Sequence, residues 1–284
     1  MTGYASIDKP WLKYYSEEQI KSNHKTNQMS IAQAFQSCID DYGNIPVLQY
    51  MGKTITIKKM LQYGDRVASF LLRENIKPGD IVSVCLPCIP EFVYYFYAIN
   101  KLGAISNWVD FRAGEEELIE LFQKTESKII VTFQGVDEKV LCAIEKAYSE
   151  IPSKPLVVRV FPSDSIMMPF KILLKAKEQA ILNKHMQHHN ICIVKHSSVV
   201  KKHPGCQVPL YQFKENSTAV IVYTGGTTGF SKGVELTNEN LNALFDNYAN
   251  SSVNLKAGES FLHFLPPWTA YGLGMLFTTI RSGV

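Results

Sequence analysis

The stretch KPGDIVSVCLPCIPEFVYYFYAINKLGAISNWV, residues 77–109, shows how the chain is built. The residues KPGD predict a turn, and the apolar run IVSVC that follows predicts a buried strand. Pro90 suits the first turn of a helix, which Gly103 ends, and AISNWV is a second strand candidate. Two short strands joined by a helix predict a parallel pair with a crossover connection.

The same alternation continues along the chain. The runs KIIVTF and PLVVRV predict strands, and GEEELIELFQKT and DEKVLCAIEKAY predict the helices between them. Upstream, Ser30 is a candidate helix cap, IPVLQYMGKTITI a hairpin, and residues 57–75 a helix. We therefore expect an α/β fold of layered, mostly parallel sheets with flanking helices.

Composition narrows the classes of function. With 284 residues, of which 46% are hydrophobic, the chain can bury a sizeable core as one or two domains. A net charge of +3 gives no general support for nucleic-acid binding. The N-terminus lacks the basic start and apolar core of a signal peptide, and no run approaches the ~18 apolar residues that span a bilayer. We expect a cytoplasmic protein, soluble or at most peripheral to a membrane.

Six cysteines are spread along the chain without the spacing of a disulfide framework. Cys85 and Cys88 form a CxxC, but no second pair accompanies them and Cys85 closes an apolar strand. Buried free thiols are favoured over a redox pair or a metal site. Reduced thiols fit the cytoplasm.

The alternation loosens between about Phe161 and Gln212. Residues 171–203 hold seven lysines and one glutamate, a local charge of +6. Residues 170–186 predict an amphipathic helix. Its apolar side comprises Ile172, Leu173, Ala176, Ala180 and Ile181. A solvated surface helix and a segment that contacts anionic lipid or admits an apolar substrate both remain open.

Histidines also gather in this insert. His185 and His189 have the i, i+4 spacing of a zinc pair, but no glutamate follows His185 and no cysteine lies at ligand spacing. We therefore predict ordinary surface histidines at these positions and at His188, His196 and His203, and no metal site.

A glycine-rich loop follows the apolar run TAVIVY, residues 218–223, which predicts a central strand. Ligands of open α/β sheets bind at the carboxyl ends of strands, and glycines let backbone amides approach an anion. Four hydroxyl side chains and Lys232 add donors, so the loop suits a polyphosphate. Neither the P-loop nor GxGxxG spacing is present. Thr237 is a candidate cap for the helix that follows.

The loop YTGGTTGFSKGVELTNENL closely resembles the phosphate-loop signature of the adenylate-forming enzymes: acyl-CoA synthetases, luciferases and peptide-synthetase adenylation domains. The family pattern is approximately T-S-G-T-T-G-x-P-K-G-V. The matching residues are Thr224, Gly226, Thr227, Thr228, Gly229, Lys232, Gly233 and Val234. Gly225 stands in place of the usual serine and Ser231 in place of proline, which predicts a more mobile empty loop. Residues 77–109 and most of the remaining chain are also similar to this family.

The resemblance implies where ATP would be held. Lys232 and Thr224 would act in catalysis. The residues implied to bind ATP are Thr224, Gly225, Gly226, Thr227, Thr228, Gly229, Ser231 and Lys232. The later stretch FLHFLPPWTAYGLG is similar to a family motif beside the acyl-carboxylate pocket, L-P-x-aromatic-His-x-x-Gly. It implies substrate contacts from Trp268, Thr269, Tyr271 and Gly272, with Thr269 in place of the common histidine.

By this resemblance, the chain is the N-terminal part of an ATP-dependent carboxylate–CoA ligase, with two interleaved α/β subdomains within residues 1–284. In the implied reaction, the acid would attack ATP to form an acyl-adenylate, and coenzyme A would then take the acyl group. Mg²⁺ would stabilise the charge on the transferring oxygens in both steps. The family's magnesium-binding glutamate, its ribose-binding aspartate and its C-terminal lid normally lie further along, so we expect these residues alone to be inactive. We expect a fatty acid, since the basic insert and pocket aromatics suit an apolar acid.

Two alternatives stay open. An amino-acid-adenylating domain normally holds the substrate amine with an aspartate, and none occurs between Asp246 and Val284. A non-catalytic nucleotide-binding module gains support from Thr269 and from the missing segments.

Overall fold

The computed structural model describes most of the chain. The described residues are 2–17, 20, 27–135, 137–150, 154–185, 191–202, 208–224, 231–249 and 255–284. The tip of the glycine loop, residues 225–230, lies outside them.

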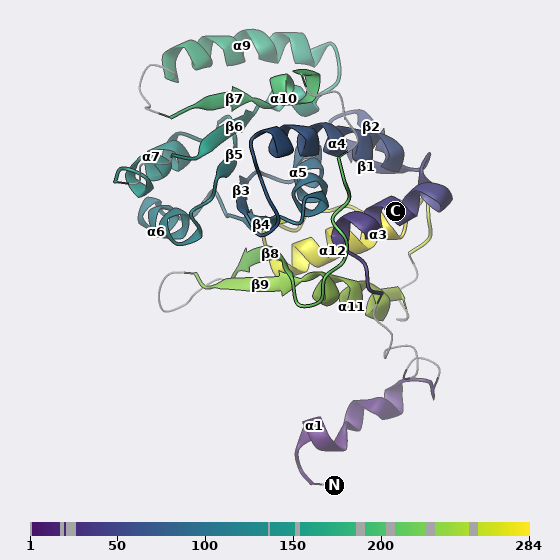
Figure 1. Ribbon diagram of the computed structural model, residues 1–284. Coiled ribbons are helices and arrows are strands. Elements are labelled where there is room, and N and C mark those ends of the chain that lie inside the picture. The colour runs from purple at the N-terminus through teal and green to yellow at the C-terminus, as the bar shows by residue number, and fades with distance from the viewer. Residues whose placement is uncertain are drawn as a thin grey trace.

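A seven-stranded sheet forms the centre of the molecule, with the strand order β7-β6-β5-β3-β4-β8-β9 (Figure 1). Its strands are β3 (Ile81–Cys85), β4 (Ile105–Trp108), β5 (Ile129–Phe133), β6 (Leu156–Val160), β7 (Ile193–Lys195), β8 (Thr218–Tyr223) and β9 (Gly233–Thr237). Every neighbouring pair is parallel except β8 and β9, which are antiparallel. A separate antiparallel hairpin consists of β1 (Pro46–Tyr50) and β2 (Lys53–Thr56).

Helices cover both faces of the sheet (Figure 1). The longer ones are α3 (Ile31–Tyr42), α4 (Ile57–Arg73), α5 (Pro90–Lys101), α6 (Glu115–Thr125), α7 (Asp137–Ala147), α9 (Phe170–His185), α11 (Asn238–Ala249) and α12 (Ala270–Arg281). The shorter ones are α1 (Ala5–Asp8), the 3-10 helix η1 (Pro10–Tyr14), α8 (Pro162–Ser165) and α10 (His196–Lys202).

Two hydrophobic clusters lie on opposite faces of the sheet. Successive residues of a strand point to opposite faces, and in β5 Ile129 and Val131 belong to one cluster while Ile130 belongs to the other. Helices α3, α4, α5 and α12 pack in the first cluster, and α6 and α7 pack in the second. The sheet is therefore buried on both faces, as its continuous apolar strands predict.

Local signals in the sequence explain where the helices begin. The Ser30 hydroxyl accepts a hydrogen bond from the backbone N–H of Gln33, whose side chain accepts one from Ser30, so α3 starts with a full capping box. Pro90 occupies the first turn of α5, where no backbone N–H is needed. Thr237 and Asn240 cap α11 in the same reciprocal way as Ser30 and Gln33.

The α/β fold with a mostly parallel sheet, the hairpin and the predicted helices are confirmed. The structure adds strand β9, which the sequence did not predict. The glycine loop therefore connects two antiparallel strands, β8 and β9, before the helix that Thr237 caps. The apolar run TAVIVY lies next to this added edge strand.

Two surface predictions need correction. Cys88 and Cys192 are free but exposed, because both lie in connections outside the strands, so the prediction of buried thiols is wrong for them. His196 is only 3% exposed, because it begins α10 and packs against Tyr95. The side chain of His185 and all of His188, His189 and His203 lie outside the described residues, as does Cys206.

Candidate functional site

The direction of the sheet connections changes between β3 and β4. The chain leaves β3 for α5 and then pairs β4 on one side of β3, while α6 leads from β4 back to β5 on the other side. Helices α5 and α6 lie on opposite faces. In open α/β sheets, ligands bind outside the carboxyl ends of the strands at such a switch point. Residues 86–89 and 109–114 border this point.

The base of the glycine loop lies at this same edge. Strand β8 is parallel to β4, with Asn107 opposite Ile221, so Thr224 follows β8 beside the chain leaving β4. The Thr224 N–H donates to the Lys232 carbonyl over 3.1 Å and closes the base of the hairpin. The backbone N–H of Ser231 donates to Glu117 of α6 over 3.3 Å.

The side chain of Lys232 is exposed and forms no ion pair with another residue of the described ranges. Of the eight residues expected to hold ATP, the structure brings Thr224, Ser231 and Lys232 together at the base of the hairpin. The other five, Gly225, Gly226, Thr227, Thr228 and Gly229, lie outside the described residues. A free amine next to a donor-rich tip suits an anionic ligand.

A buried polar network supports the strands beneath the hairpin. The Tyr223 hydroxyl donates to Oδ1 of Asn107 over 2.8 Å, and Nδ2 of Asn107 donates to Ser83 over 2.7 Å. Ser83 and Ser127 share a hydrogen bond of 2.6 Å. This chain of bonds joins β8, β4 and β3, so it holds the carboxyl end of β8 in a defined position.

A second part of the site, besides the hairpin base, forms where the chain leaves β4. Arg112 binds Asp110 through two pairs of atoms, Nε to Oδ1 at 2.9 Å and Nη2 to Oδ2 at 2.8 Å. Burial alone would raise the pKa of the Asp110 carboxyl, but hydrogen bonds from Arg112 outweigh it and hold the pKa below its ordinary value. The Arg112 guanidinium lies 5.1 Å from the centroid of the Trp268 ring, and Phe111 meets that ring edge-on at 5.2 Å.

The motif around Trp268 therefore lies at the same edge of the sheet as the base of the glycine-loop hairpin. Trp268 is only 9% exposed and packs on the residues that follow β4. Thr269 caps α12: its hydroxyl accepts from the Gly272 N–H over 3.1 Å and donates to the Pro266 carbonyl over 2.8 Å. A Cβ on Gly272 would lie 2.0 Å from that carbonyl, so only glycine fits. Tyr271 is 69% exposed.

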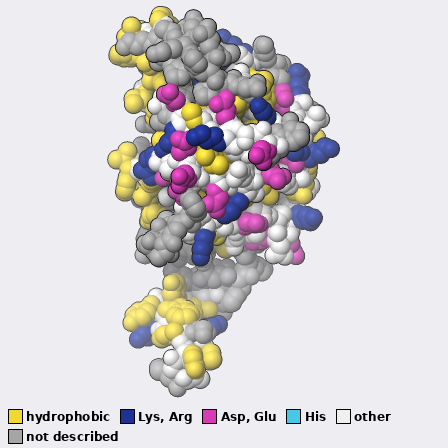
Figure 2. All heavy atoms as spheres, turned by 90° about the vertical axis from the view of Figure 1, so that its left-hand side faces the viewer, with side chains coloured by type: hydrophobic (Ala, Val, Ile, Leu, Met, Phe, Trp, Pro, Cys, Tyr) yellow, Lys and Arg dark blue, Asp and Glu magenta, His cyan; other side chains and the backbone are white. Residues whose placement is uncertain are grey.

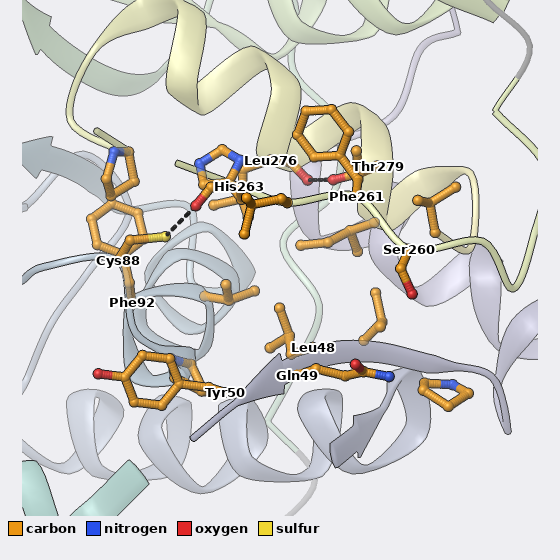
Figure 3. A pocket seen from close by; sticks show the side chains of 18 of the residues that line it. Leu48, Gln49, Tyr50, Cys88, Phe92, Ser260, Phe261, His263, Leu276 and Thr279 are labelled. Atoms are coloured by element: carbon orange, nitrogen blue, oxygen red, sulfur yellow. Dashed lines mark hydrogen bonds between the residues drawn. The ribbon is translucent and has the colours of Figure 1, made fainter. Parts of the chain in front are cut away.

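A cavity of about 310 Å³ lies next to this motif, between β1, the start of α5, residues 259–267 and α12 (Figure 3). Leu48, Phe92, Phe261 and Leu276 supply apolar walls, and Figure 3 shows them on opposite sides of the space. The four predicted substrate residues do not line it, although the neighbouring Pro267 does.

Polar groups at the cavity are few. Cys88 is exposed as a whole residue, but its sulfur lines the cavity and faces the His263 carbonyl at 4.0 Å (Figure 3). Local desolvation of this sulfur raises the pKa of the thiol to about 11. The ring nitrogens of His263 are buried and have no hydrogen-bond partner among the described residues, and burial lowers its pKa. A thiol that is protonated at neutral pH is a poor nucleophile, which removes chemical support for a reactive CxxC.

Sequence reasoning missed several residues of this site. Asp110, Arg112 and Glu117 were not singled out, because each is an ordinary charged residue near the start of a helix. The signal was available: residues 109–114 follow a strand at the point where the connections change direction. Recognising it required the strand order, which places β5 on the far side of β3.

Comparison with known proteins gives the family. A model of the family described as "AMP-binding enzyme" matches residues 35–284. The chain belongs to this family, whose signature the glycine loop resembles.

Curated relatives are CoA ligases. A long-chain-fatty-acid–CoA ligase of Bacillus subtilis (strain 168) is 27% identical over 275 residues, which is 93% of this chain and 46% of the relative. A 4-coumarate–CoA ligase, CCL1, of Humulus lupulus is 28% identical and covers 67% of this chain and 29% of its own length. The chain thus spans less than half the length of these relatives.

Solved structures show the same fold. The N-terminal domain of FACL13 from Mycobacterium tuberculosis matches with a TM-score of 0.68 at 18% identity, covering 90% of this chain and 56% of that one. The adenylation domain of a carboxylate reductase from Mycobacterium chelonae matches with a TM-score of 0.73 at 14% identity, covering 98% and 45%. The fold is that of the N-terminal part of adenylate-forming enzymes.

The described residues of the site fit the phosphates of ATP better than they fit Mg²⁺. The exposed amine of Lys232 and the hairpin base suit the phosphates of ATP. Within the described ranges, no group of three or more histidine, cysteine or acidic side chains is arranged to hold a metal ion. Mg²⁺ is therefore assigned no ligands among the residues that the structure describes.

Proposed function

We propose that this chain supplies the triphosphate-binding part of an ATP-dependent carboxylate–CoA ligase that works through an acyl-adenylate. The observation that carries the proposal is the hairpin base at the carboxyl end of β8, where Thr224 and Lys232 are joined beside the chain leaving β4. Membership in the AMP-binding family and relatives named as CoA ligases support it.

The residues of the chain have distinct parts in this proposal. The Lys232 amine would pair with phosphate oxygens as their charge shifts during transfer, which is the main way proteins assist such reactions. Thr224 and Ser231, together with residues 225–229, would donate hydrogen bonds to the same oxygens. Asp110 and Trp268 hold Arg112 in place, so we assign Arg112 to positioning Trp268 and the chain that follows β4, and not to contacting a ligand.

An apolar carboxylic acid, and a fatty acid in particular, is the proposed substrate. One relative is named as a long-chain-fatty-acid–CoA ligase, and Trp268 and Tyr271 are aromatic. Other relatives are named for 4-coumarate and as short-chain acyl-CoA synthetases, so the acid must be tested directly. Trp268 would act here through packing, since it is buried against Phe111.

ATP binding to residues 1–284, measured by isothermal titration calorimetry, tests the proposal. We expect Lys232→Ala to weaken ATP binding by about tenfold or more, the effect of losing one charge-assisted contact of about 1.5–3 kcal/mol. The control is Lys77→Ala, which removes an exposed lysine before β3, at the opposite edge of the sheet, and should leave binding unchanged. Equal affinity of Lys232→Ala and the parent chain would refute the assignment of the hairpin.

Catalysis is a separate measurement. We propose that residues 1–284 alone exchange pyrophosphate into ATP far more slowly than the ~1 s⁻¹ at the low end of typical enzymes. A rate at or above that value would show that this part of the protein needs no further segment for adenylation.

A nucleotide-binding module without catalysis is the second candidate. It is favoured by Thr269, which stands where the family commonly has histidine and whose hydroxyl is already engaged in capping α12. Such a module would show the same dependence of ATP binding on Lys232. It would differ by forming no acyl-adenylate with any acid when the whole protein is assayed.

A further inference from the structure

Helix α9 buries Glu178 and leaves two large apolar side chains, Ile172 and Leu173, exposed to solvent. Glu178 is only 7% exposed and accepts two hydrogen bonds from Ser163, from its N–H over 2.7 Å and its hydroxyl over 2.5 Å. Ile172 and Leu173 lie about 120–140° around the helix from Glu178, on either side of the opposite face. They are 62% and 64% exposed. A surface helix normally turns its apolar stripe inward.

More apolar side chains continue this exposed face. Met167, Met168 and Phe170 precede or begin α9 and are 54%, 56% and 67% exposed. Met51, 64% exposed, lies in the adjacent β1–β2 turn, where the Met167 methyl is 3.6 Å from the position of a Cβ on Gly52. We call this surface the α9 apolar patch. It comprises Met51, Met167, Met168, Phe170, Ile172 and Leu173.

The space-filling view agrees with this arrangement. Hydrophobic side chains lie along the upper end of the molecule, where α9 is, in Figure 2. Single exposed apolar residues are ordinary, but a contiguous group of this kind marks a surface that another phase or molecule covers.

Lysines border the patch. Lys171 and Lys175 are on α9, and Lys59 begins α4 beside the hairpin. Burial lowers the pKa of the Lys53 amine, and the charges of Lys171 and Lys59 lower it further, so these amines lie near one another. In the sequence, residues 171–203 carry a local charge of +6 and the rest of the chain −3.

We propose that the α9 apolar patch docks on the surface of an anionic lipid bilayer. Apolar side chains of an interfacial helix enter the boundary between headgroups and acyl chains, while lysines reach the phosphates with their amines. Each basic side chain near an anionic surface strengthens binding, and salt weakens it. No helix among the described residues is long and apolar enough to cross a bilayer, so the docking is peripheral.

Charge complementarity favours lipid over the other possible covers. A second copy would place the lysines of one chain against those of the other. The proposal does not depend on the proposed ligase activity, because binding to vesicles is measured without ATP or an acid.

Vesicle flotation of residues 1–284 tests the proposal. We expect the chain to float with vesicles of phosphatidylcholine and phosphatidylglycerol, to remain unbound with phosphatidylcholine alone, and to release as salt is raised. The double variant Ile172→Glu, Leu173→Glu should bind the anionic vesicles at least about tenfold more weakly. Lys171→Ala, Lys175→Ala should lower binding by several-fold and flatten its salt dependence.

The matched control is Leu262→Glu, Phe264→Glu. These two side chains are 81% and 76% exposed, lie outside the α9 patch and are not bordered by the lysine-rich insert. The control should bind vesicles like the parent chain, and circular dichroism should show all three double variants folded. The proposal is overturned if the parent chain does not bind anionic vesicles, or if Ile172→Glu, Leu173→Glu binds them as well as the control Leu262→Glu, Phe264→Glu does. It is also overturned if the α9 change only abolishes self-association seen by sedimentation velocity.

Discussion

Helices α5 and α9 both carry large apolar side chains, but their surroundings are opposite. Every residue of α5 is buried, including Glu91 and Lys101. In α9, Ile172 and Leu173 are mostly exposed, while Glu178 is buried. Helix α5 joins β3 to β4 at the centre of the sheet, whereas α9 lies before β7 at one edge (Figure 1).

This difference shows that the place of a helix in the sheet helps to decide which of its apolar side chains are buried. A crossover helix at the centre of a sheet is enclosed by its neighbours, and α5 packs against both α3 and α4. At the edge, the helix has a partner on one side only. The polar contacts of α8, through Ser163, decide which side of α9 faces inward.

The largest expected effect distinguishes these two environments directly. Phe96 of α5 is fully buried, with its ring 4.8 Å from Trp108 and 5.8 Å from Phe35, so Phe96→Ala should lower the free energy of unfolding by about 3–5 kcal/mol. Phe170→Ala in α9 removes a ring that is 67% exposed and should change it by less than about 0.5 kcal/mol. Urea unfolding measures both. Similar losses would mean that α9 is packed against the protein.

A buried histidine in the same insert gives the next effect. Burial lowers the pKa of His196 to about 3, below the value of about 6.5 in an unfolded chain. Between these values the unfolded chain binds more protons, so stability is present above pH 6.5 and lost as pH falls. The expected loss is about 1.4 kcal/mol per pH unit.

The measurement is urea unfolding at pH 7.0 and 5.5 of the parent chain and of His196→Gln. The glutamine retains a partner for the Tyr95 hydroxyl, which lies 3.1 Å from His196, but does not titrate. The parent should lose more stability than the variant over this interval. Equal losses would place His196 at the surface, as the sequence originally predicted.

The smallest effect concerns the polar network at the centre of the sheet. Tyr223→Phe removes the donor to Asn107 and leaves that buried oxygen unsatisfied, so it should cost about 1–2 kcal/mol. Tyr94→Phe is the matched control, because the Tyr94 hydroxyl is buried with no partner among the described residues and its removal should be neutral or stabilising. If the two changes cost the same, the network does not support the hairpin base.

Much of the central sheet was predictable from the sequence. The strands around Val82, Ile130 and Val158 are mostly apolar, and each is followed by a helical pattern, which predicts a parallel, buried arrangement. Strand β9 was not predictable from the sequence. Its residues, GVELT, are exposed or half-exposed, and apolar and polar side chains alternate only weakly along it. Its pairing with β8 creates the strand character that the local sequence lacks.

The candidate site divides in the same way. The hydroxyls and Lys232 of the glycine loop were recognisable because their residue types and spacing carry the chemistry. The contact of Phe111 with Trp268 brings together positions more than 150 residues apart. No local pattern predicts such a contact, because it follows from the strand order. The two α/β subdomains, the substrate and the role of each loop residue remain predictions.

The sequence by itself determined the alternation of strands and helices, their caps and the set of hydroxyl and amine donors in the glycine loop, because these depend on neighbouring residues. The tertiary structure alone decided that β4 and β8 are adjacent, that Trp268 packs on the residues after β4, that His196 is buried and that Ile172 and Leu173 of α9 are exposed. Those outcomes depend on which distant segments compete for the same surface, and the free energy of that competition is set by the whole fold.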